Sequence, residues 1–481
     1  MLKKSKENKN MKKSASSYLD QINPFVAGID IGSRAHFVAA PVRNIEGKIE
    51  IEVREFSAFT SGLREMADWL KECKVISVAM ESTSVYWISP YELLESQGFA
   101  VHLVDARHVK NVTGRKTDVK DCQWIQQLHA CGLLSAAFRP ADKLLPLRGY
   151  MRQRDNLIKS SARCILHMQK AMTQMNLHLS NVLTDVTGKT GMMIIRAIVA
   201  GERNPKKLAM LRDPHCKNTQ EIIEQSLTGN YRAEHLFSLQ QALELFDFYQ
   251  QQILECDKKI EEALVLLNPM PAPKSAAKKT RNEGNDTKPR MYKRREGNAL
   301  YFDPSEHLLS LVGVDLTKIP GIESNSALKL LSEIGTDMNK WKTSGHFASW
   351  LGLSPENKMS GGKQLSSKTK PSANRAAGFF RMAALVLSRS QTSLGAFFRR
   401  IKAKHGTAKA ITATARKIAV IFYQMIKEGE EYVEAGMQQY EEKYRERLMH
   451  GIQKRASDLG YMLVPINITL ISPPKMEKNC A

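Results

Sequence analysis

The sequence lacks the features of a membrane protein or a secreted protein. Its 481 residues contain no run of about 18 apolar residues, so no transmembrane helix is expected. The basic N-terminal stretch MLKKSKENKNMKKS has no apolar segment after it and does not resemble a secretory signal. The seven cysteines are scattered, without a Cys-x-x-Cys pair, which argues against a disulfide framework and a structural zinc site. A reducing, cytoplasmic compartment fits this pattern.

Acidic residues are few relative to basic ones. The chain has 71 Lys and Arg against 49 Asp and Glu, a formal net charge of +22 and a pI near 9.6. A charge of this size is typical of proteins that bind a polyanion. Nucleic acid is favoured over a membrane surface, because no basic amphipathic helix with a bulky aromatic face is present. An incidentally basic surface is the alternative.

Strands and helices alternate in the N-terminal part of the chain. Period-2 alternation and continuous apolar runs indicate strands, and apolar residues three and four apart indicate helices. Three strands followed by alternating helices and strands predict an α/β layer architecture. The predicted strands are 25–32, 35–42, 49–56, 75–81 and 99–105, and the predicted helices are 60–72, 86–97 and 116–131.

Acidic residues end two of these otherwise apolar strands, at Asp30 and Glu81. Asp118 and Asp121 are three residues apart, so they share one helix face. Taken singly, Asp30 could cap a turn, and the two helical acids could interact with the helix dipole. Taken together, four carboxylates suit divalent metal ions in a phosphoryl-transfer site of a ribonuclease-H-like sheet.

Two long helices are predicted after this part. Positions 147–179 and 236–267, taken at alternating spacings of four and three, are apolar at eight of ten positions in each stretch. The exceptions are Arg154, Ser161, Gln250 and Asp257. A smaller helical segment lies between them, at about 190–228. Together these helices predict a protruding coiled-coil-like arm, and its functional interpretation is dimerisation. The methionines in the stripe indicate packing.

The rest of the chain is predicted to contain a linker and a second globular region. Residues 268–298 hold four prolines and many Lys and Arg without apolar periodicity, which predicts disorder. Leu316–Gly335 has the pattern of a helix-hairpin-helix, whose second helix can present amides to a phosphate. Further helices are predicted at about 372–390, 407–427 and 438–459, and no structure is expected from Pro465 onward.

Ser360 precedes two glycines in a cationic stretch. A serine in such a loop is most often a turn residue. The alternative is a nucleophile whose developing phosphate charge is met by nearby cations. Those cations are Lys358, Lys363, Lys368, Lys370 and Arg375.

Several longer segments resemble one family in the same order along the chain. The family is that of the DEDD insertion-sequence transposases (the insertion-sequence-one-hundred-ten family), whose members are RNA-guided recombinases. The resemblance covers most of residues 25–430. The segments that carry it are GIDIGSRAHFVA, MESTSVYW, RKTDVKDCQWIQQLHACGLL, KIPGIESNSALKLLSEIG, FASWLGLSPENKMSGGKQLSSKT and AITATARKIA.

The resemblance implies a fold and a set of domains. We expect an α/β ribonuclease-H-like (RuvC-like) catalytic domain at residues 23–143, a coiled-coil arm at 144–268 and a mostly α C-terminal transposase domain at 304–430. Around them we expect a basic disordered arm at 1–22, a basic disordered linker at 269–303 and a basic helical tail at 431–481. The arm insertion and the basic linker make this chain longer than a compact member of the family.

The resemblance also implies a reaction. Position by position, the acidic tetrad of the family falls on Asp30, Glu81, Asp118 and Asp121, and its serine falls on Ser360. The tetrad is expected to bind Mg²⁺ or Mn²⁺, and the serine is expected to attack a DNA phosphate and form a covalent intermediate. The implied partners are donor and target DNA, a structured guide RNA and further copies of the chain, as a dimer or tetramer, in a prokaryotic cytoplasm beside the nucleoid.

The sequence leaves three other functions to consider. A metal-dependent junction endonuclease or DNA invertase would need the tetrad but not Ser360. An actin-like or sugar-kinase-like ATPase is suggested by GIDIGS, but the second Asp-x-Gly phosphate strand and a Gly-rich adenosine motif are not found at matching places. A non-enzymatic nucleic-acid-binding protein is disfavoured, because four carboxylates near DNA are repulsive unless a metal intervenes.

Overall fold

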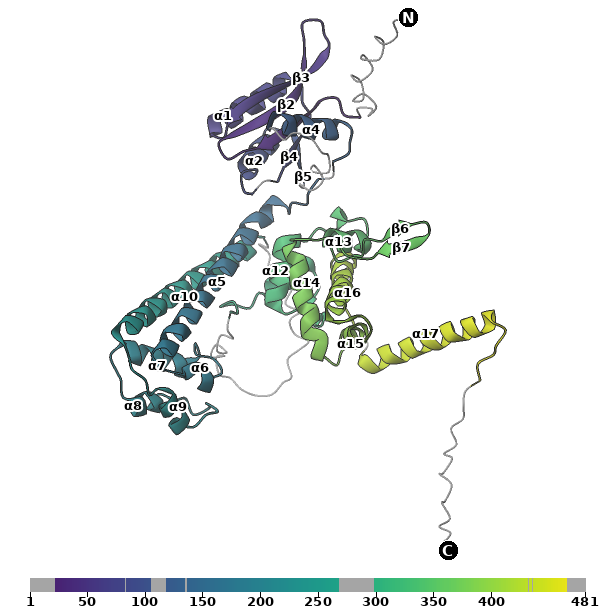
Figure 1. Cartoon of the computed structure of the whole chain (residues 1–481). Helices are drawn as coiled ribbons and strands as arrows, with labels where there is room; N and C mark the ends of the chain where they lie inside the picture. Colours follow the sequence, from purple (N-terminus) through teal and green to yellow (C-terminus); the bar gives the residue numbers. More distant parts are fainter. Residues whose placement is uncertain are drawn as a thin grey trace, which may run out of the picture. The chain divides into compact units, whose positions relative to one another are not determined.

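The computed structural model describes residues 22–82, 84–104, 118–134, 136–267, 298–430, 432–434 and 436–464, with the backbone alone at 118–120, 358, 437 and 443. The predicted basic arm up to residue 21, the linker up to residue 297 and the chain from Pro465 onward lie outside these residues. The chain forms two compact units, Met1–Arg139 and Pro140–Ala481 (Figure 1).

The first unit is a five-stranded sheet with helices on both faces. In chain order its elements are β1 (Val26–Ile31), β2 (Ala35–Arg43), β3 (Ile49–Ser57), α1 (Thr60–Glu72), β4 (Ser77–Glu81), α2 (Ile88–Ser96), β5 (Ala100–Val104) and α4 (Asp118–Ala130). The strand order is β3-β2-β1-β4-β5, with β2 antiparallel to its neighbours and β4 parallel to β1 and β5. This is the order of a ribonuclease-H-like sheet, so the predicted α/β fold is confirmed.

The two faces of β1 pack against different helices. Ile29 belongs to the buried core that includes Met66 of α1. Because side chains alternate along a strand, Gly28 points to the opposite face, where α4 crosses the sheet. A Cβ at Gly28 would lie 2.3 Å from the backbone nitrogen of Gln126 and 2.4 Å from the carbonyl oxygen of Cys122. Helix α4 can therefore approach this closely because the strand carries a glycine here.

The second unit consists of a long helix pair with a small helical tip, followed by a mostly helical C-terminal body. The pair is α5 (Leu145–Gln174), which follows η1 (Asp142–Leu144), and α10 (Ala233–Leu267). The tip contains α6 (Leu179–Val182), α7 (Lys189–Val199), α8 (Pro205–Met210) and α9 (Gln220–Ser226). Buried side chains of the tip, such as Ile194 and Leu208, pack against Met168 and Leu239 of the helix pair.

The C-terminal body contains a small hairpin among its helices. Its elements are α11 (Ser305–Val312), η2 (Leu316–Lys318), α12 (Ser324–Ile334), η3 (Met338–Lys340), α13 (Ser344–Trp350), β6 (Lys358–Ser360), β7 (Lys363–Ser366), α14 (Arg375–Val386), η4 (Leu387–Arg389), α15 (Ser393–His405), α16 (Thr407–Glu428) and α17 (Met437–Asp458). Rings of Phe347, Phe380 and Phe422 meet in its core. No helix in the described part of the chain has the length and apolar character needed to span a membrane.

The polar residues in the two predicted seams pair with one another across α5 and α10. Gln250 Nε2 donates a hydrogen bond to Ser161 Oγ at 3.0 Å. Arg154 Nε donates to Asp257 Oδ1, and both side chains are fully buried. Arg154 Nη2 also donates to the carbonyl oxygens of residues 298–299, at 2.9 and 3.0 Å. From Arg154 to Ser161 the residue numbers rise along α5, while those of their partners fall from Asp257 to Gln250 along α10. The two helices are therefore antiparallel.

A second ionic contact attaches the C-terminal body to α5. Glu333 of α12 is buried and accepts hydrogen bonds from Arg148 Nε at 3.0 Å and from Arg152 Nε and Nη2 at 2.8 and 2.7 Å. Burial acts to raise the pKa of Glu333, but the hydrogen bonds from Arg152 and the charge of Arg148 bring it below its usual value. One turn along, Lys329 Nζ binds Asp155 Oδ1 at 2.9 Å.

We predict that Arg154→Met strongly destabilises the helix pair, because Asp257 is left buried without its charged partner. Removing one member of a buried ion pair costs about 3–5 kcal/mol. Urea unfolding followed by circular dichroism at a helical wavelength would measure the loss of stability.

Arg196→Met is the matched control. Arg196 binds Asp247 of α10 through two hydrogen bonds of 2.6 and 2.7 Å, but these side chains are 52% and 41% exposed. Exposed pairs contribute less than about 1 kcal/mol. Equal losses from Arg154→Met and Arg196→Met would contradict the importance given to burial.

Candidate active site

Asp30 and Glu81 occupy matching positions on two adjacent parallel strands. Asp30 is the last but one residue of β1, and Glu81 is the last residue of β4. Ile29 pairs with Met80 in this ladder, so the two acids occupy the next position on each strand. Both acids are half-buried. Because residues at the same position of parallel strands point to the same side, their side chains share one face of the sheet.

That face is the one covered by α4. Ile29 and Met80 belong to the core on the side of α1 and α2, so Asp30 and Glu81 point the other way. Asp121, the third acid, is half-buried in the first turns of α4. Helix α4 begins at Asp118, whose side chain lies outside what the structure describes. Three of the four predicted ligands thus come from elements that meet on one face.

Cys122 follows Asp121 in α4, and the charges of both Asp30 and Asp121 act on its thiol. Its thiol is fully buried, and its pKa is raised to about 12, first by burial. The negative charges of Asp30 and Asp121 raise the pKa further, against hydrogen bonds from the backbone that lower it. Both carboxylates are therefore near enough to the thiol to act on it electrostatically.

A polar contact with β4 holds the C-terminal end of α4, away from the acids. Ser77 Oγ of β4 lies 2.8 Å from Nε2 of His129, and it also donates to the carbonyl oxygen of Ala100 at 3.0 Å. The ring of His102 lies 4.9 Å from that of His129. Burial, and then the charge of His102, lower the pKa of His129 to about 4, so His129 is neutral at physiological pH. Sequence reasoning missed this contact, because its members are separated by about fifty residues.

The acids alone do not form a complete metal site. Among the side chains that the structure describes, no group of three or more His, Cys, Asp or Glu is arranged to hold a metal ion. The donor chemistry nevertheless fits Mg²⁺, because carboxylate oxygens are the ligands that this hard cation uses. Asp118 is the fourth predicted ligand.

Ser360 lies at the tip of the β6–β7 hairpin in the second unit (Figure 1). It pairs with Lys363 across a two-residue loop, in which Gly361 and Gly362 have φ of +54° and +75°. Two consecutive left-handed residues are typical of a type I′ turn, which explains the pair of glycines. The serine is exposed, so its hydroxyl is presented to solvent on a projecting hairpin.

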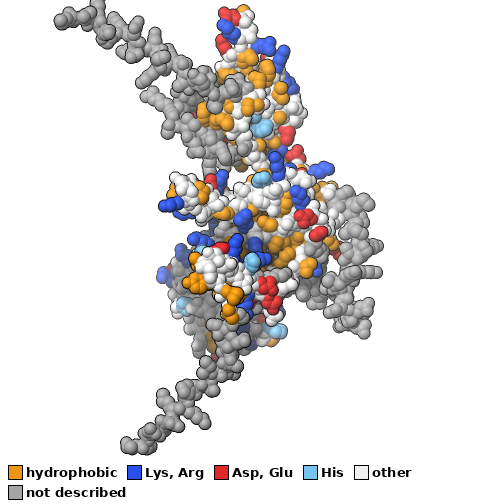
Figure 2. Space-filling model, turned by 90° about the vertical axis from the view of Figure 1, so that its right-hand side faces the viewer, with side chains coloured by type: hydrophobic (Ala, Val, Ile, Leu, Met, Phe, Trp, Pro, Cys, Tyr) orange, Lys and Arg blue, Asp and Glu red, His pale blue; other side chains and the backbone are white. Residues whose placement is uncertain are grey.

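The predicted cations around Ser360 are distributed over the hairpin and the segment after it. Four of these side chains are exposed: Lys363, Lys368, Lys370 and Arg375. The side chain of Lys358 is not among those that the structure describes. Lys370 Nζ is 3.8 Å from Glu356 Oε1. Figure 2 shows one face of the molecule, on which Lys and Arg side chains are spread widely while Asp and Glu side chains form small groups.

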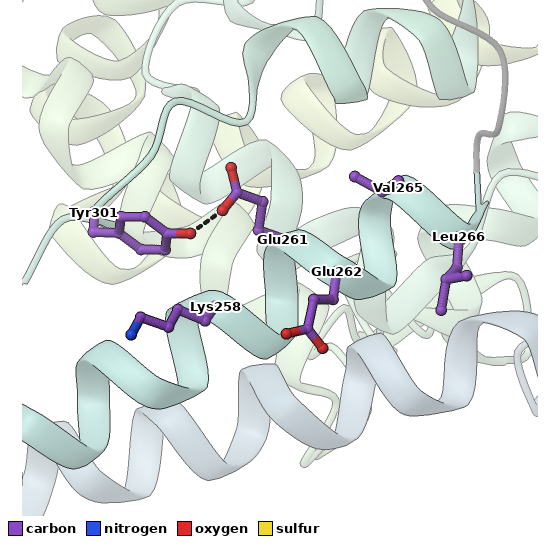
Figure 3. A pocket seen from close by; sticks show the side chains of 6 residues that line it. All are labelled: Lys258, Glu261, Glu262, Val265, Leu266 and Tyr301. Carbon is purple, nitrogen blue, oxygen red and sulfur yellow. Dashed lines mark hydrogen bonds between the residues drawn. The ribbon is translucent and has the colours of Figure 1, made fainter.

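A cavity in the second unit is not part of this site. It has a volume of about 570 Å³ and lies beside the end of α10 (Figure 3). Its walls are Lys258, Glu261, Glu262, Val265, Leu266 and Tyr301. The hydroxyl of Tyr301 donates to Glu261 across it. None of the predicted site residues lines the cavity.

Two family models match the chain. Residues 27–177 match a model of DEDD transposases of the IS110 family, described as "Transposase". Residues 313–399 match one described as "Transposase IS116/IS110/IS902 family". The chain belongs to the IS110 family of DEDD transposases. The transposase is thus an enzyme that cleaves and rejoins DNA. Its acids Asp30, Glu81, Asp118 and Asp121 lie in the first matched segment, and Ser360 lies in the second.

The other comparisons add little to this assignment. No curated protein matches the transposase. Among solved structures it is similar to "T. thermophilus RuvC in complex with Holliday junction substrate", at 13% identity and a TM-score of 0.19, covering 23% of this chain and 99% of that one. It is also similar to "Thermus thermophilus RuvC structure", at 15% identity and a TM-score of 0.18, with the same coverage.

Gly28→Ala is predicted to disrupt the site without touching an acid. The new methyl group would clash with the backbone of α4, so the helix must shift away from Asp30 and Glu81. Overpacking of this kind costs about 1–3 kcal/mol or more. Thermal unfolding and a DNA cleavage assay would measure both effects, and we expect lower stability and loss of cleavage.

Gly149→Ala serves as the matched control. Gly149 lies in α5 with nothing within 4 Å of an added Cβ. Alanine is the better helix former there and should stabilise the protein by roughly 0.4–1 kcal/mol. Wild-type stability and cleavage in the Gly28→Ala protein would show that α4 does not depend on the glycine.

Proposed function

We propose that the transposase exchanges DNA strands by a metal-assisted attack of Ser360 on a DNA phosphate. The observation that carries the proposal is the shared register and shared face of Asp30 and Glu81 beneath α4. Paired carboxylates at such a place, in a DEDD transposase, suit the binding of divalent cations beside DNA. The basic charge of the chain supports a polyanionic substrate.

Asp30, Glu81, Asp118 and Asp121 would hold one or two Mg²⁺ or Mn²⁺ ions. When bound, such an ion would polarise the scissile phosphate and neutralise charge on the leaving oxygen. The four carboxylates would be repulsive toward DNA on their own, so their role requires that cation. Burial beneath α4 would orient the carboxylates and reduce the water around them.

Ser360 would be the nucleophile. Its hydroxyl oxygen would bond to the phosphorus while the bond to one DNA oxygen breaks, and the proton lost by the serine balances the one gained by the leaving oxygen. A hydroxyl of a second DNA strand would then reverse the step and release Ser360. The exposed cations Lys363, Lys368 and Lys370, with Lys358 and Arg375, would offset the charge on the phosphate.

The active site would be assembled from both units. The acids belong to the first unit and Ser360 to the second, so strand exchange requires them to dock, within one chain or between copies. A homo-oligomer, a dimer or a tetramer, would follow from docking between copies. A structured RNA that pairs with donor and target DNA would supply the sequence specificity.

Ser360→Ala is predicted to abolish the covalent protein–DNA species and strand exchange. Ser367→Ala, an exposed serine on the same segment, is the matched control and should behave as wild type. Denaturing electrophoresis of protein incubated with labelled DNA would detect the covalent species. If Ser360→Ala still cuts DNA and leaves free ends, water is the attacking group and the junction endonuclease alternative applies.

Asp30→Asn is predicted to abolish both cleavage and the covalent species through loss of metal binding. Asp68→Asn, which removes an exposed acid from α1, should leave both unchanged. Cleavage measured against Mg²⁺ and Mn²⁺ concentration would separate the two variants. Full activity of Asp30→Asn at the wild-type metal requirement would exclude Asp30 as a ligand.

A further inference from the structure

Helices α15 and α16 carry a concentration of positive charge that the proposed chemistry does not use. Between Ser393 and Glu428 the chain has eight Lys and Arg residues and a single acidic residue, Glu428. Most of this segment lies beyond the second family match, which ends at residue 399. Helix α17 packs against α15.

Cations and aromatic rings alternate where these three helices meet. Arg400 Cζ lies 3.8 Å from the ring centre of Tyr444 and 5.1 Å from that of Tyr440. Lys417 Nζ lies 4.4 Å from the ring centre of Phe397 and 5.6 Å from that of Tyr440. We call these five residues, together with the neighbouring Arg447 of α17, the α15–α17 junction.

Carboxylates do not compensate the cations of the junction. Within the described part of the chain, Arg400, Lys417 and Arg447 form no ion pair. Nη1 of Arg400 is buried without a hydrogen-bond partner. The pKa of Lys417 is lowered, first by the protein packed around it and then by the charges of Arg400 and Arg447. An anion bound here would relieve the repulsion between these like charges.

The packing of α17 against α15 explains the presence of only some of the residues in the α15–α17 junction. Contacts between Arg400 and the rings of Tyr440 and Tyr444 are sufficient to attach α17 to α15. Lys417 also lies over rings of both helices, but the side chains of Lys417 and Arg447 are exposed and add positive charge to a surface that is already basic. Tyr444 is 40% exposed, and Arg400 lies over one face of its ring.

We propose that the α15–α17 junction binds single-stranded nucleic acid. Lys417 and Arg447 contact the phosphodiester backbone, and Tyr444 is the surface on which a base stacks. Cations that follow the backbone, interleaved with aromatic rings that accept bases, are the combination used by proteins that bind single strands. The inference does not depend on Ser360 or on the acids.

The test is equilibrium binding of the full-length protein to fluorescent oligouridylate and oligothymidylate, measured by anisotropy at several salt concentrations. Lys417→Gln combined with Arg447→Gln should lower affinity about tenfold. It should also reduce the slope of log affinity against log salt by roughly 1.4, because each lost phosphate contact on a single strand contributes about 0.7. Tyr444→Leu should lower affinity about tenfold with an unchanged slope, because stacking does not release counterions.

Lys206→Gln combined with Lys217→Gln is the matched control. Both lysines are exposed on the tip of the helix pair, so this variant loses the same charge elsewhere. It should bind as wild type, as should Ser360→Ala, which separates this inference from the proposed reaction. A loss seen with only one of the two oligonucleotides identifies RNA or DNA as the ligand. Wild-type affinity and slope of the Lys417/Arg447 variant with both oligonucleotides, or an equal loss in the control, would overturn the proposal.

Discussion

The second unit depends on the buried ion pair between Arg154 and Asp257. Taking both charges out of water is costly, and the pairing offsets that cost only if the geometry is kept. Sliding α5 along α10 by one turn would separate this pair and the pair of Ser161 and Gln250 together, so the polar residues fix the register of the two helices. Because Arg154 also binds the carbonyl oxygens of residues 298–299, the same contact fixes where the C-terminal body begins.

Helix α5 connects this contact to the rest of the body. Arg148 and Arg152 lie within two turns of Arg154 and bind the buried Glu333 of α12. The first family match includes all of α5 and the second includes α12, so this joint links the two matched segments. The hairpin that carries Ser360 therefore belongs to a body with a fixed attachment to the helix pair, which agrees with the role proposed for Ser360.

In the first unit the site is positioned by a close approach between the backbones of a strand and a helix, and not by a buried ion pair. Gly28 lets α4 lie against β1, and the contact between Ser77 and His129 holds the other end of the helix. Beyond Gly28, on the side away from Ser77, the same face of the sheet bears Asp30 and Glu81. Its acids are half-buried, so they keep access to water and to ions while α4 limits their freedom. This arrangement agrees with the proposed cation site, in which the acids would act together.

Local patterns in the sequence were sufficient to predict most of the strands and the two long helices, because the period of apolar residues follows directly from which side of an element is buried. They also marked Asp30 and Glu81 as acids in otherwise apolar strands. Helix α15 and the β6–β7 hairpin were missed. The apolar residues of the hairpin, Met359 and Leu365, are exposed, so the hairpin has no alternation of buried and exposed positions to detect. Only the tertiary structure decided that Asp30 and Glu81 share a face, that Arg154 meets Asp257, and that Ser360 lies at a hairpin tip. The reason is that periodicity specifies which face of an element is buried but not which distant residue it will contact.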